Sequence, residues 1–294
     1  MKTLSKIFIS AIILVLSVST ISAKEYSFKV EVSGEGKDMI LIPGLSCTGE
    51  VWKETVKHYK GDFRCHVITL PGFGTCSPVN FGESFNEFIS KELINYVKEQ
   101  KLDKPYIIGH SLGGFLALKL ETQNPGTFAG LIIVDALPFL PAIMNPMATA
   151  ESMKPMALNM KSQMSNRKKG ESVEFLRPMM KSMTNDSTNA ETILNWSFES
   201  DPKTVAQANY ELYITDLRND LEKAECPILV MGAWIAYKGY GVTHEITYTN
   251  YKNQYAKAKN ATIKITDKGK HFIMWDDTDF FYKLSDNFLG KNQI

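Results

Sequence analysis

The stretch between residues 106 and 120 limits the folds open to this chain more than any other. It reads YIIGHSLGGFLALKL: a short apolar run, the turn Gly-x-Ser-x-Gly at 109–113, and then a proline-free segment of helix-forming residues. The two outer glycines leave room where a Cβ would crowd the adjoining strand or helix. This order of strand, tight turn and helix is typical of a nucleophile elbow. It places the hydroxyl of Ser111 above a sheet, at the positive end of a helix.

Buried strands alternate with helices on both sides of this turn. Continuous apolar runs follow an alternating first strand at 26–32, and they predict strands at 39–42, 65–70, 106–108, 131–134, 227–231 and 262–265. Helices are expected at 48–59, at 84–100, after Ser111, and at 277–289. The alternation predicts an α/β fold with a mostly parallel sheet and helices on both faces.

The alternation stops between residues 137 and 221, where the sequence shows helical segments and no clear strand. We interpret this segment as a helical cap, inserted into a core of residues 24–136 and 222–294, that covers the active-site edge of the sheet. Nine of the 13 methionines lie between Met144 and Met183. Their helical spacing favours ordinary packing, and their concentration also favours some contribution to an apolar pocket.

Residues 1–23 resemble a secretory signal peptide. Lys2 and Lys6 precede a short apolar run at 7–18, and Ala23 supplies a small residue at the expected cleavage site. The run is short for a membrane span, so we expect an exported protein, periplasmic or secreted, with no stable membrane anchor after cleavage. The formal net charge of +1 gives no indication of nucleic-acid binding.

Export would place the cysteines at 47, 65, 76 and 226 in an oxidising environment. Four thiols allow three pairings, and the sequence does not choose among them. Cys65 and Cys226 each begin an apolar strand and can serve as small buried hydrophobes. Cys47 and Cys76 lie in loops that follow strands, so this is the expected pair if a disulfide forms.

A serine hydroxyl is a weak nucleophile and needs a base. Of the five histidines, His271 is the best placed, because it follows the last predicted strand and precedes the final helix. His110 lies inside the turn, and we expect its side chain to point away from the pocket of Ser111. The sequence contains no dinucleotide fingerprint, phosphate-binding loop or His-Glu-x-x-His motif, so neither a metal nor an organic cofactor is implied.

Four segments resemble the α/β-hydrolase superfamily: LIPGL at 41–45, LPGFG at 70–74, GHSLGG at 109–114 and GKHF at 269–272. The resemblance extends over residues 26–289 and implies a capped serine hydrolase. It implies Ser111 as the nucleophile and His271 as the general base. The backbone N–H groups of Leu45 and Leu112 would form the oxyanion hole.

The acid that would orient His271 is not in its most common place. In many capped members of the superfamily it follows the strand after the cap, but here residues 232–238 read GAWIAYK and the next carboxylate is Glu245. Asp135, at the end of the strand after the elbow helix, is the preferred candidate, and Glu245, Asp216 and Asp201 remain open. We expect Trp234 and Tyr237 to line the pocket or to brace His271.

These features predict a carboxylic ester hydrolase acting on an ester, a lactone or a similar small, apolar acyl compound through an acyl-enzyme. Two alternatives remain. The same site could carry out thioester, carbon–carbon or peroxidase-like chemistry, because a fold does not choose its substrate. The missing carboxylate after the cap is also compatible with a non-catalytic protein that binds a small molecule.

Overall fold

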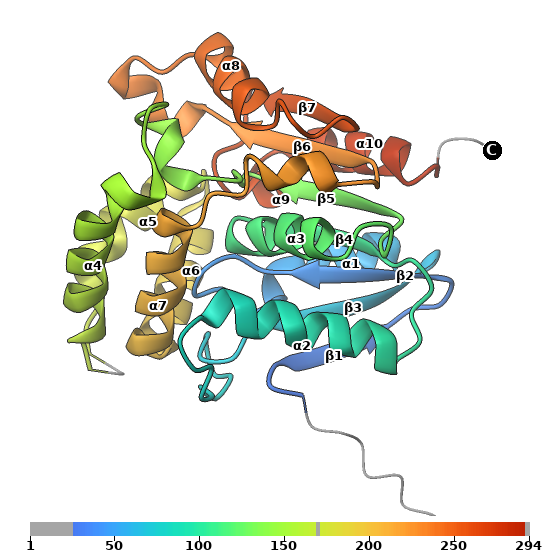
Figure 1. Cartoon of the computed structure of the whole chain (residues 1–294), viewed down its shortest axis with the longest axis horizontal. Coiled ribbons are helices and arrows are strands. Elements are labelled where there is room, and N and C mark those ends of the chain that lie inside the picture. Colours follow the sequence, from blue (N-terminus) through green and yellow to red (C-terminus); the bar gives the residue numbers. More distant parts are fainter. Residues whose placement is uncertain (1–25, 169–170, 292–294) are drawn as a thin grey trace, which may run out of the picture.

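The computed structural model describes residues 26–168 and 171–291, so the expected signal peptide at 1–23 lies outside the described residues. A seven-stranded sheet runs through the centre of the molecule in the order β1-β3-β2-β4-β5-β6-β7 (Figure 1). The strands are β1 Lys29–Ser33, β2 Lys37–Ile42, β3 Phe63–Thr69, β4 Tyr106–His110, β5 Gly130–Val134, β6 Ile228–Ala233 and β7 Ala261–Thr266. Only β1 pairs antiparallel, with β3, so the predicted mostly parallel sheet is confirmed.

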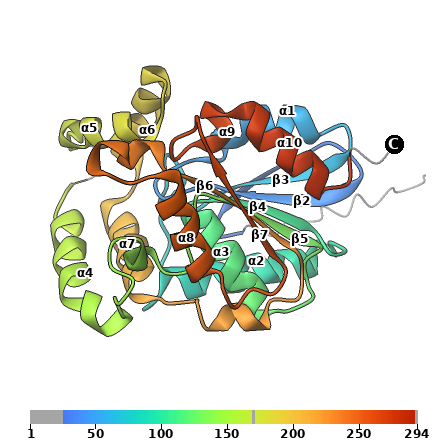
Figure 2. The same ribbon diagram turned by 90° about the horizontal axis from the view of Figure 1, so that it is seen from above.

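Helices cover both faces of the sheet, as the sequence predicted (Figure 2). On one face lie α2 (Phe85–Glu99), α3 (Leu112–Gln123) and α8 (His244–Gln254), and on the other lie α1 (Lys53–Tyr59), α9 (Ile273–Asp276) and α10 (Thr278–Phe288). Successive side chains of a strand enter opposite cores. In β2, for example, Ile40 belongs to one apolar cluster and Leu41 to the other. Burial on both faces explains why these strands are continuous apolar runs.

Polar side chains cap the N-termini of several helices. The expected helix at 48–59 is a 3-10 turn, η1 (Gly49–Trp52), followed by α1, and the Thr48 hydroxyl accepts from the first turn. Ser84 caps α2 by accepting from the N–H of Glu87 at 3.2 Å. Asp277 caps α10. Each cap satisfies a backbone donor that the helix itself leaves unpaired.

The segment between β5 and β6 contains helices and no strand among its described residues. It comprises η2 Leu140–Ile143, α4 Ala150–Ser165, η3 Glu174–Leu176, α5 Arg177–Met183, α6 Ser187–Glu199, α7 Pro202–Ile214 and η4 Asp220–Lys223. Helices α4 to α7 lie beyond the carboxyl ends of the central strands (Figure 1). We refer to residues 137–221 as the cap segment. No helix among the described residues is long and apolar enough to span a bilayer.

All four cysteines are buried free thiols, so the structure does not contain the expected Cys47–Cys76 disulfide. Cys47 and Cys65 belong to one apolar cluster, and Cys226 belongs to the other. Burial raises the pKa of Cys47 to about 12 and that of Cys65 to about 11. These residues therefore act as small hydrophobes, because a thiol without its thiolate form reacts slowly.

A buried carboxylate joins the cap segment to the core. Glu211 in α7 is 4% exposed and accepts from the N–H groups of Phe85 and Asn86 at 2.7 and 2.8 Å and from the Ser84 hydroxyl at 2.9 Å. Gln207 also donates to it, at 2.6 Å. Neither N–H group has a partner within α2, and both lie at the positive end of this helix, where negative charge is favourable. Glu211 of α7 therefore caps the first turn of the core helix α2.

We expect Glu211→Ala to lower the free energy of unfolding by about 3 kcal/mol, because it leaves buried donors without a partner. Urea unfolding followed by circular dichroism measures the change. Glu199→Ala is the matched control. It removes an exposed carboxylate at the end of α6 and should change stability by less than about 0.5 kcal/mol. Equal stability of the two variants would contradict this role of Glu211.

Candidate active site

The turn at Ser111 has the strained geometry that its sequence indicates. Ser111 lies between β4 and α3 with φ 53° and ψ −118°, and its N–H donates to the carbonyl of Val134 at 2.9 Å. A Cβ on Gly109 would lie 2.4 Å from the Gly113 carbonyl oxygen, and one on Gly113 would lie 2.2 Å from that of Ile42. Both positions therefore require glycine. A non-glycine residue with positive φ costs about 1–3 kcal/mol, and such strain is concentrated at functional sites.

Asp135 and His271 form a hydrogen-bonded pair at the same edge of the sheet. His271 follows β7 and precedes α9, and its Nδ1 lies 2.6 Å from Oδ2 of Asp135, although the two residues are 136 positions apart. Asp135 directly follows β5 with φ 46°, and its N–H donates to the carbonyl of Met231 at 2.7 Å. The carboxylate accepts the Nδ1 proton, so Nε2 is the nitrogen left to accept another.

The second oxygen of the Asp135 carboxylate is also occupied. Oδ1 accepts from the N–H of Ala233 at 2.8 Å and from the hydroxyl of Tyr251 at 2.7 Å. With His271, the carboxylate therefore accepts from three donors, which hold it in one orientation. Sequence reasoning missed Tyr251, because nothing in the composition of its helix indicates a partner 116 residues away.

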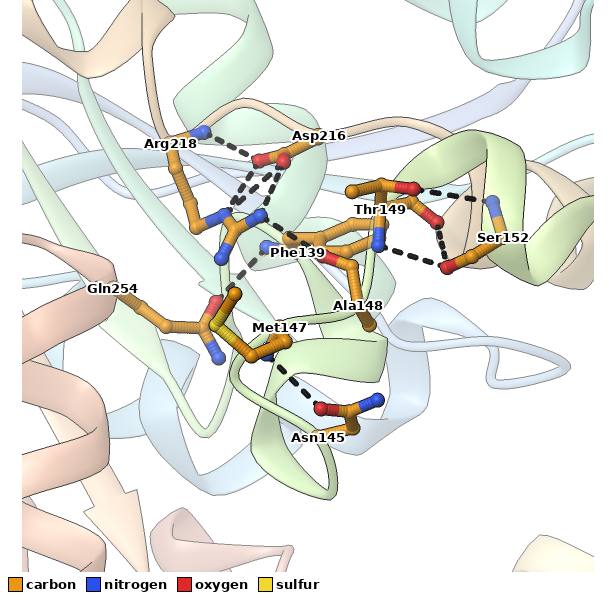
Figure 3. Close-up of polar contacts among 9 residues, drawn as sticks. All are labelled: Phe139, Asn145, Met147, Ala148, Thr149, Ser152, Asp216, Arg218 and Gln254. Carbon is orange, nitrogen blue, oxygen red and sulfur yellow. Dashed lines mark hydrogen bonds and ion pairs between the residues drawn. The ribbon is translucent and has the colours of Figure 1, made fainter.

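The other candidate acids are engaged elsewhere. Asp216 pairs with Arg218 at 2.6 Å, and Arg218 also donates to the carbonyl of Ala148 (Figure 3). Asp201 caps α7 by accepting from the N–H of Thr204 at 2.8 Å. Glu245 lies exposed in the first turn of α8. Among the described residues, Asp135 is the candidate acid that contacts His271.

The cluster around Arg218 joins the two ends of the cap segment. The Arg218 guanidinium lies 4.9 Å from the ring centre of Phe139, and Leu217 donates its N–H to the carbonyl of Pro138 at 3.0 Å. Gln254 of α8 accepts from the N–H of Phe139 (Figure 3). These contacts hold the first and last residues of the cap segment next to each other.

His110 supports the loop that carries His271. It is 1% exposed, its Nε2 donates to the carbonyl of His271 at 3.0 Å, and the two rings are 4.5 Å apart. Burial, followed by the nearby His271, lowers the pKa of His110 well below its ordinary value. A neutral ring with its proton on Nε2 is therefore the stable form. The sequence placed His110 in the turn but did not predict this contact.

The two expected oxyanion donors flank the elbow. Leu112 is the first residue of α3, and Leu45 lies in the loop after β2. This loop passes close to Ser111, since a Cβ on Gly44 would lie 3.1 Å from the Cβ of Ser111. Their roles as donors remain predictions.

Ser200, from the junction of α6 and α7, is fully buried and accepts from the N–H of Gly74 at 2.8 Å. It links the cap segment to the loop after β3.

The two aromatic residues after β6 differ in their surroundings. Trp234 is half-buried and packs against the core, whereas Tyr237, in the 3-10 turn η5 (Ile235–Tyr240), is 47% exposed. Neither donates a hydrogen bond to His271 in any described contact, so their assignment to the pocket remains a prediction. Within the described residues, no cluster of three His, Cys, Asp or Glu side chains could hold a metal ion.

The fold and the elbow place the chain in a known class. The profile of the Alpha/beta hydrolase family matches residues 39–284. The chain therefore belongs to the α/β-hydrolase family, as its sequence motifs implied.

Curated relatives match part of the chain. A pimeloyl-[acyl-carrier protein] methyl ester esterase of Aeromonas salmonicida is 34% identical over 112 residues, which are 38% of this chain and 42% of the relative. The corresponding esterase of Vibrio campbellii is 33% identical over 105 residues, 36% of this chain and 39% of the relative. The chain thus spans about two fifths of the length of the curated relatives it matches.

Solved structures resemble nearly the whole fold. An esterase from Exiguobacterium antarcticum matches with a TM-score of 0.72 at 16% identity, over 90% of this chain and 95% of that one. An enol-lactonase from Burkholderia xenovorans gives 0.71 at 15% identity, over 90% and 96%. A bromoperoxidase from Bacillus anthracis gives 0.72 at 18% identity, over 90% and 95%. At these identities the likeness concerns the fold.

Proposed function

We propose that the chain is a serine hydrolase that cleaves a small carboxylic ester or lactone through an acyl-enzyme on Ser111. The observation that carries the proposal is the Asp135–His271 pair, held by further donors at the edge of the sheet where the elbow ends. A non-catalytic binding protein would not require this hydrogen-bonded, partly buried pair. The names of the relatives, which are ester and lactone hydrolases, support the same reaction class.

The proposed reaction has two halves. Nε2 of His271 takes the proton of the Ser111 hydroxyl as its oxygen attacks the acyl carbon, and the tetrahedral oxyanion is stabilised by the N–H groups of Leu45 and Leu112. The ester C–O bond then breaks, and the alcohol leaves with the proton from His271. A water molecule, deprotonated by His271, attacks the acyl-enzyme and releases the acid and free Ser111. Asp135 stabilises the imidazolium in both halves.

We assign an apolar acyl group to the substrate. Leu45 beside the elbow and Met164 on α4 are half-buried apolar side chains that pack against the same core cluster, and the cap segment is rich in methionine. Methionine side chains are flexible and adapt to apolar groups of variable shape. We also propose that the protein acts after export, in the periplasm or outside the cell, as residues 1–23 indicate.

A fluorophosphonate probe tests the reaction class, because it reacts with an activated serine. We expect one label per chain, located on Ser111 by peptide mass mapping. With p-nitrophenyl esters from acetate to octanoate, kcat/KM should rise by up to about fourfold for each buried methylene. An unlabelled protein would favour the binding-protein alternative. Labelling with no ester or lactone turnover would favour another chemistry, such as that named for the bromoperoxidase of similar fold.

A further inference from the structure

One phenol on α8 contacts the carboxylate that pairs with His271. The hydroxyl of Tyr251 donates to Oδ1 of Asp135 at 2.7 Å, while Oδ2 faces Nδ1 of His271 at 2.6 Å. Tyr251 is 2% exposed and lies one helical turn before Tyr255, which has a parallel ring. Tyr251 therefore extends the hydrogen-bonded pair of His271 and Asp135 by one group into the core.

A glycine in β6 leaves space for the ring of Tyr251. Gly232 in β6 has no side chain, and a Cβ there would lie 2.7 Å from Cζ of Tyr251, the carbon that bears the hydroxyl. Burial, followed by the charge of Asp135, raises the pKa of Tyr251 well above its ordinary value. The phenol therefore keeps its proton at working pH and remains a donor.

We propose that Tyr251 is a positioning residue that acts through Asp135 to orient His271 and to set the pH at which the site becomes active. The inference rests on the proposed function, since it assigns Tyr251 a part in the same reaction. A carboxylate that shares its charge with a phenol and a backbone N–H presents less negative charge to the imidazole. Removal of the phenol hydroxyl should favour the imidazolium and loosen the orientation of Asp135.

Other titratable groups also face this pair, and they can be separated from Tyr251. His110 from β4 lies 4.5 Å from the His271 ring, but it is buried and neutral. Tyr237 of η5 lies within electrostatic range of Asp135. Tyr255 also lies within electrostatic range of Asp135. Its hydroxyl donates to the carbonyl of Ala136 at 2.8 Å and not to the carboxylate.

Tyr255 therefore supplies a matched control. Tyr251→Phe, in α8, and Tyr255→Phe, directly after α8, each remove one buried hydroxyl and one hydrogen bond, and both should cost similar stability. We compare the pH dependence of kcat/KM for p-nitrophenyl butyrate from pH 5 to 9 in the full chain. Tyr251→Phe should move the midpoint of the acid limb upward by about half a pH unit and lower kcat about tenfold, with KM within about twofold. Tyr255→Phe should keep the wild-type profile.

Each outcome of this experiment is decisive. A Tyr251→Phe profile that matches both wild type and Tyr255→Phe would overturn the role of Tyr251, as would equal changes in the two variants. If Ser111→Ala hydrolyses the same ester as fast as wild type, the proposed function fails instead.

A second variant covers the case in which Tyr251→Phe does not fold. Site-specific 3-fluorotyrosine at position 251 keeps the ring and the hydroxyl but donates more strongly. It should move the midpoint of the acid limb downward, and an upward or absent shift would overturn the inference.

Discussion

Ser111→Ala should lower kcat for p-nitrophenyl butyrate by a factor on the order of 10⁶, which leaves only the residual catalysis that the oxyanion hole and substrate binding supply. The expected loss is this large because an acyl-enzyme needs the hydroxyl in both halves of the reaction, and water held by the remaining groups is a poor substitute. Stopped-flow and steady-state assays at matched protein concentration measure the loss. The fluorophosphonate label should disappear in the same variant.

Ser182→Ala is the matched control, since it removes an exposed hydroxyl at the end of α5 and should leave kcat unchanged. Ser111→Gly separates chemistry from folding. Glycine adopts a φ of 53° without strain, so this variant should be inactive and yet at least as stable as wild type. If Ser111→Ala keeps a substantial fraction of the activity, the reacting group lies elsewhere and the proposed mechanism is wrong.

The sheet and the elbow could be predicted because their signals are local. A strand buried on both faces has to be a continuous apolar run, and residues 39–42 and 131–134 are such runs. The two glycines around Ser111 are required by contacts of less than 2.5 Å that any Cβ would make. The family motifs indicated the same fold independently.

The choice of acid could not be made from the sequence, because it depends on where two distant loops meet. Asp135 follows a predicted strand, whereas Asp216 and Asp201 lie in the segment at 137–221, for which the sequence predicted helices without bounds. The sequence alone does not distinguish a hydrogen bond to His271 from a helix cap or a pair with Arg218. The contacts of Tyr251 and His110 were missed for a related reason. Both contacts join separate elements of the fold, and the hydrophobic periodicity of a sequence does not predict contacts of this kind.

The cysteines illustrate the same limit. Cys47 and Cys76 do lie in loops after strands, as expected, but both side chains are packed in the interior as free thiols. Loop position is a weak indicator of pairing, because a disulfide needs the two Cβ atoms to face each other at short range. Glu211 could not be predicted either, since its partners are backbone N–H groups about 125 residues earlier.

Asp135→Asn should lower kcat by a factor of about 10⁴ while the fold is retained. The cause is the tautomer of His271. A carboxylate can only accept the Nδ1 proton, which leaves Nε2 free to act as a base. An amide at this position can present its NH₂ group to Nδ1, because Ala233 and Tyr251 already donate to the other oxygen. That arrangement places the ring proton on Nε2, where it blocks removal of the serine proton.

Asp216→Asn provides the comparison, because it removes a carboxylate that the sequence left open as an alternative acid but that pairs with Arg218 (Figure 3). It should change kcat by less than about threefold, as expected for the loss of a partly exposed ion pair away from the reacting atoms. Esterase assays and unfolding curves on both variants separate activity from stability. A large loss for Asp216→Asn together with a small loss for Asp135→Asn would reverse the assignment. It would mean that Asp216 reaches His271 in another conformation of the chain.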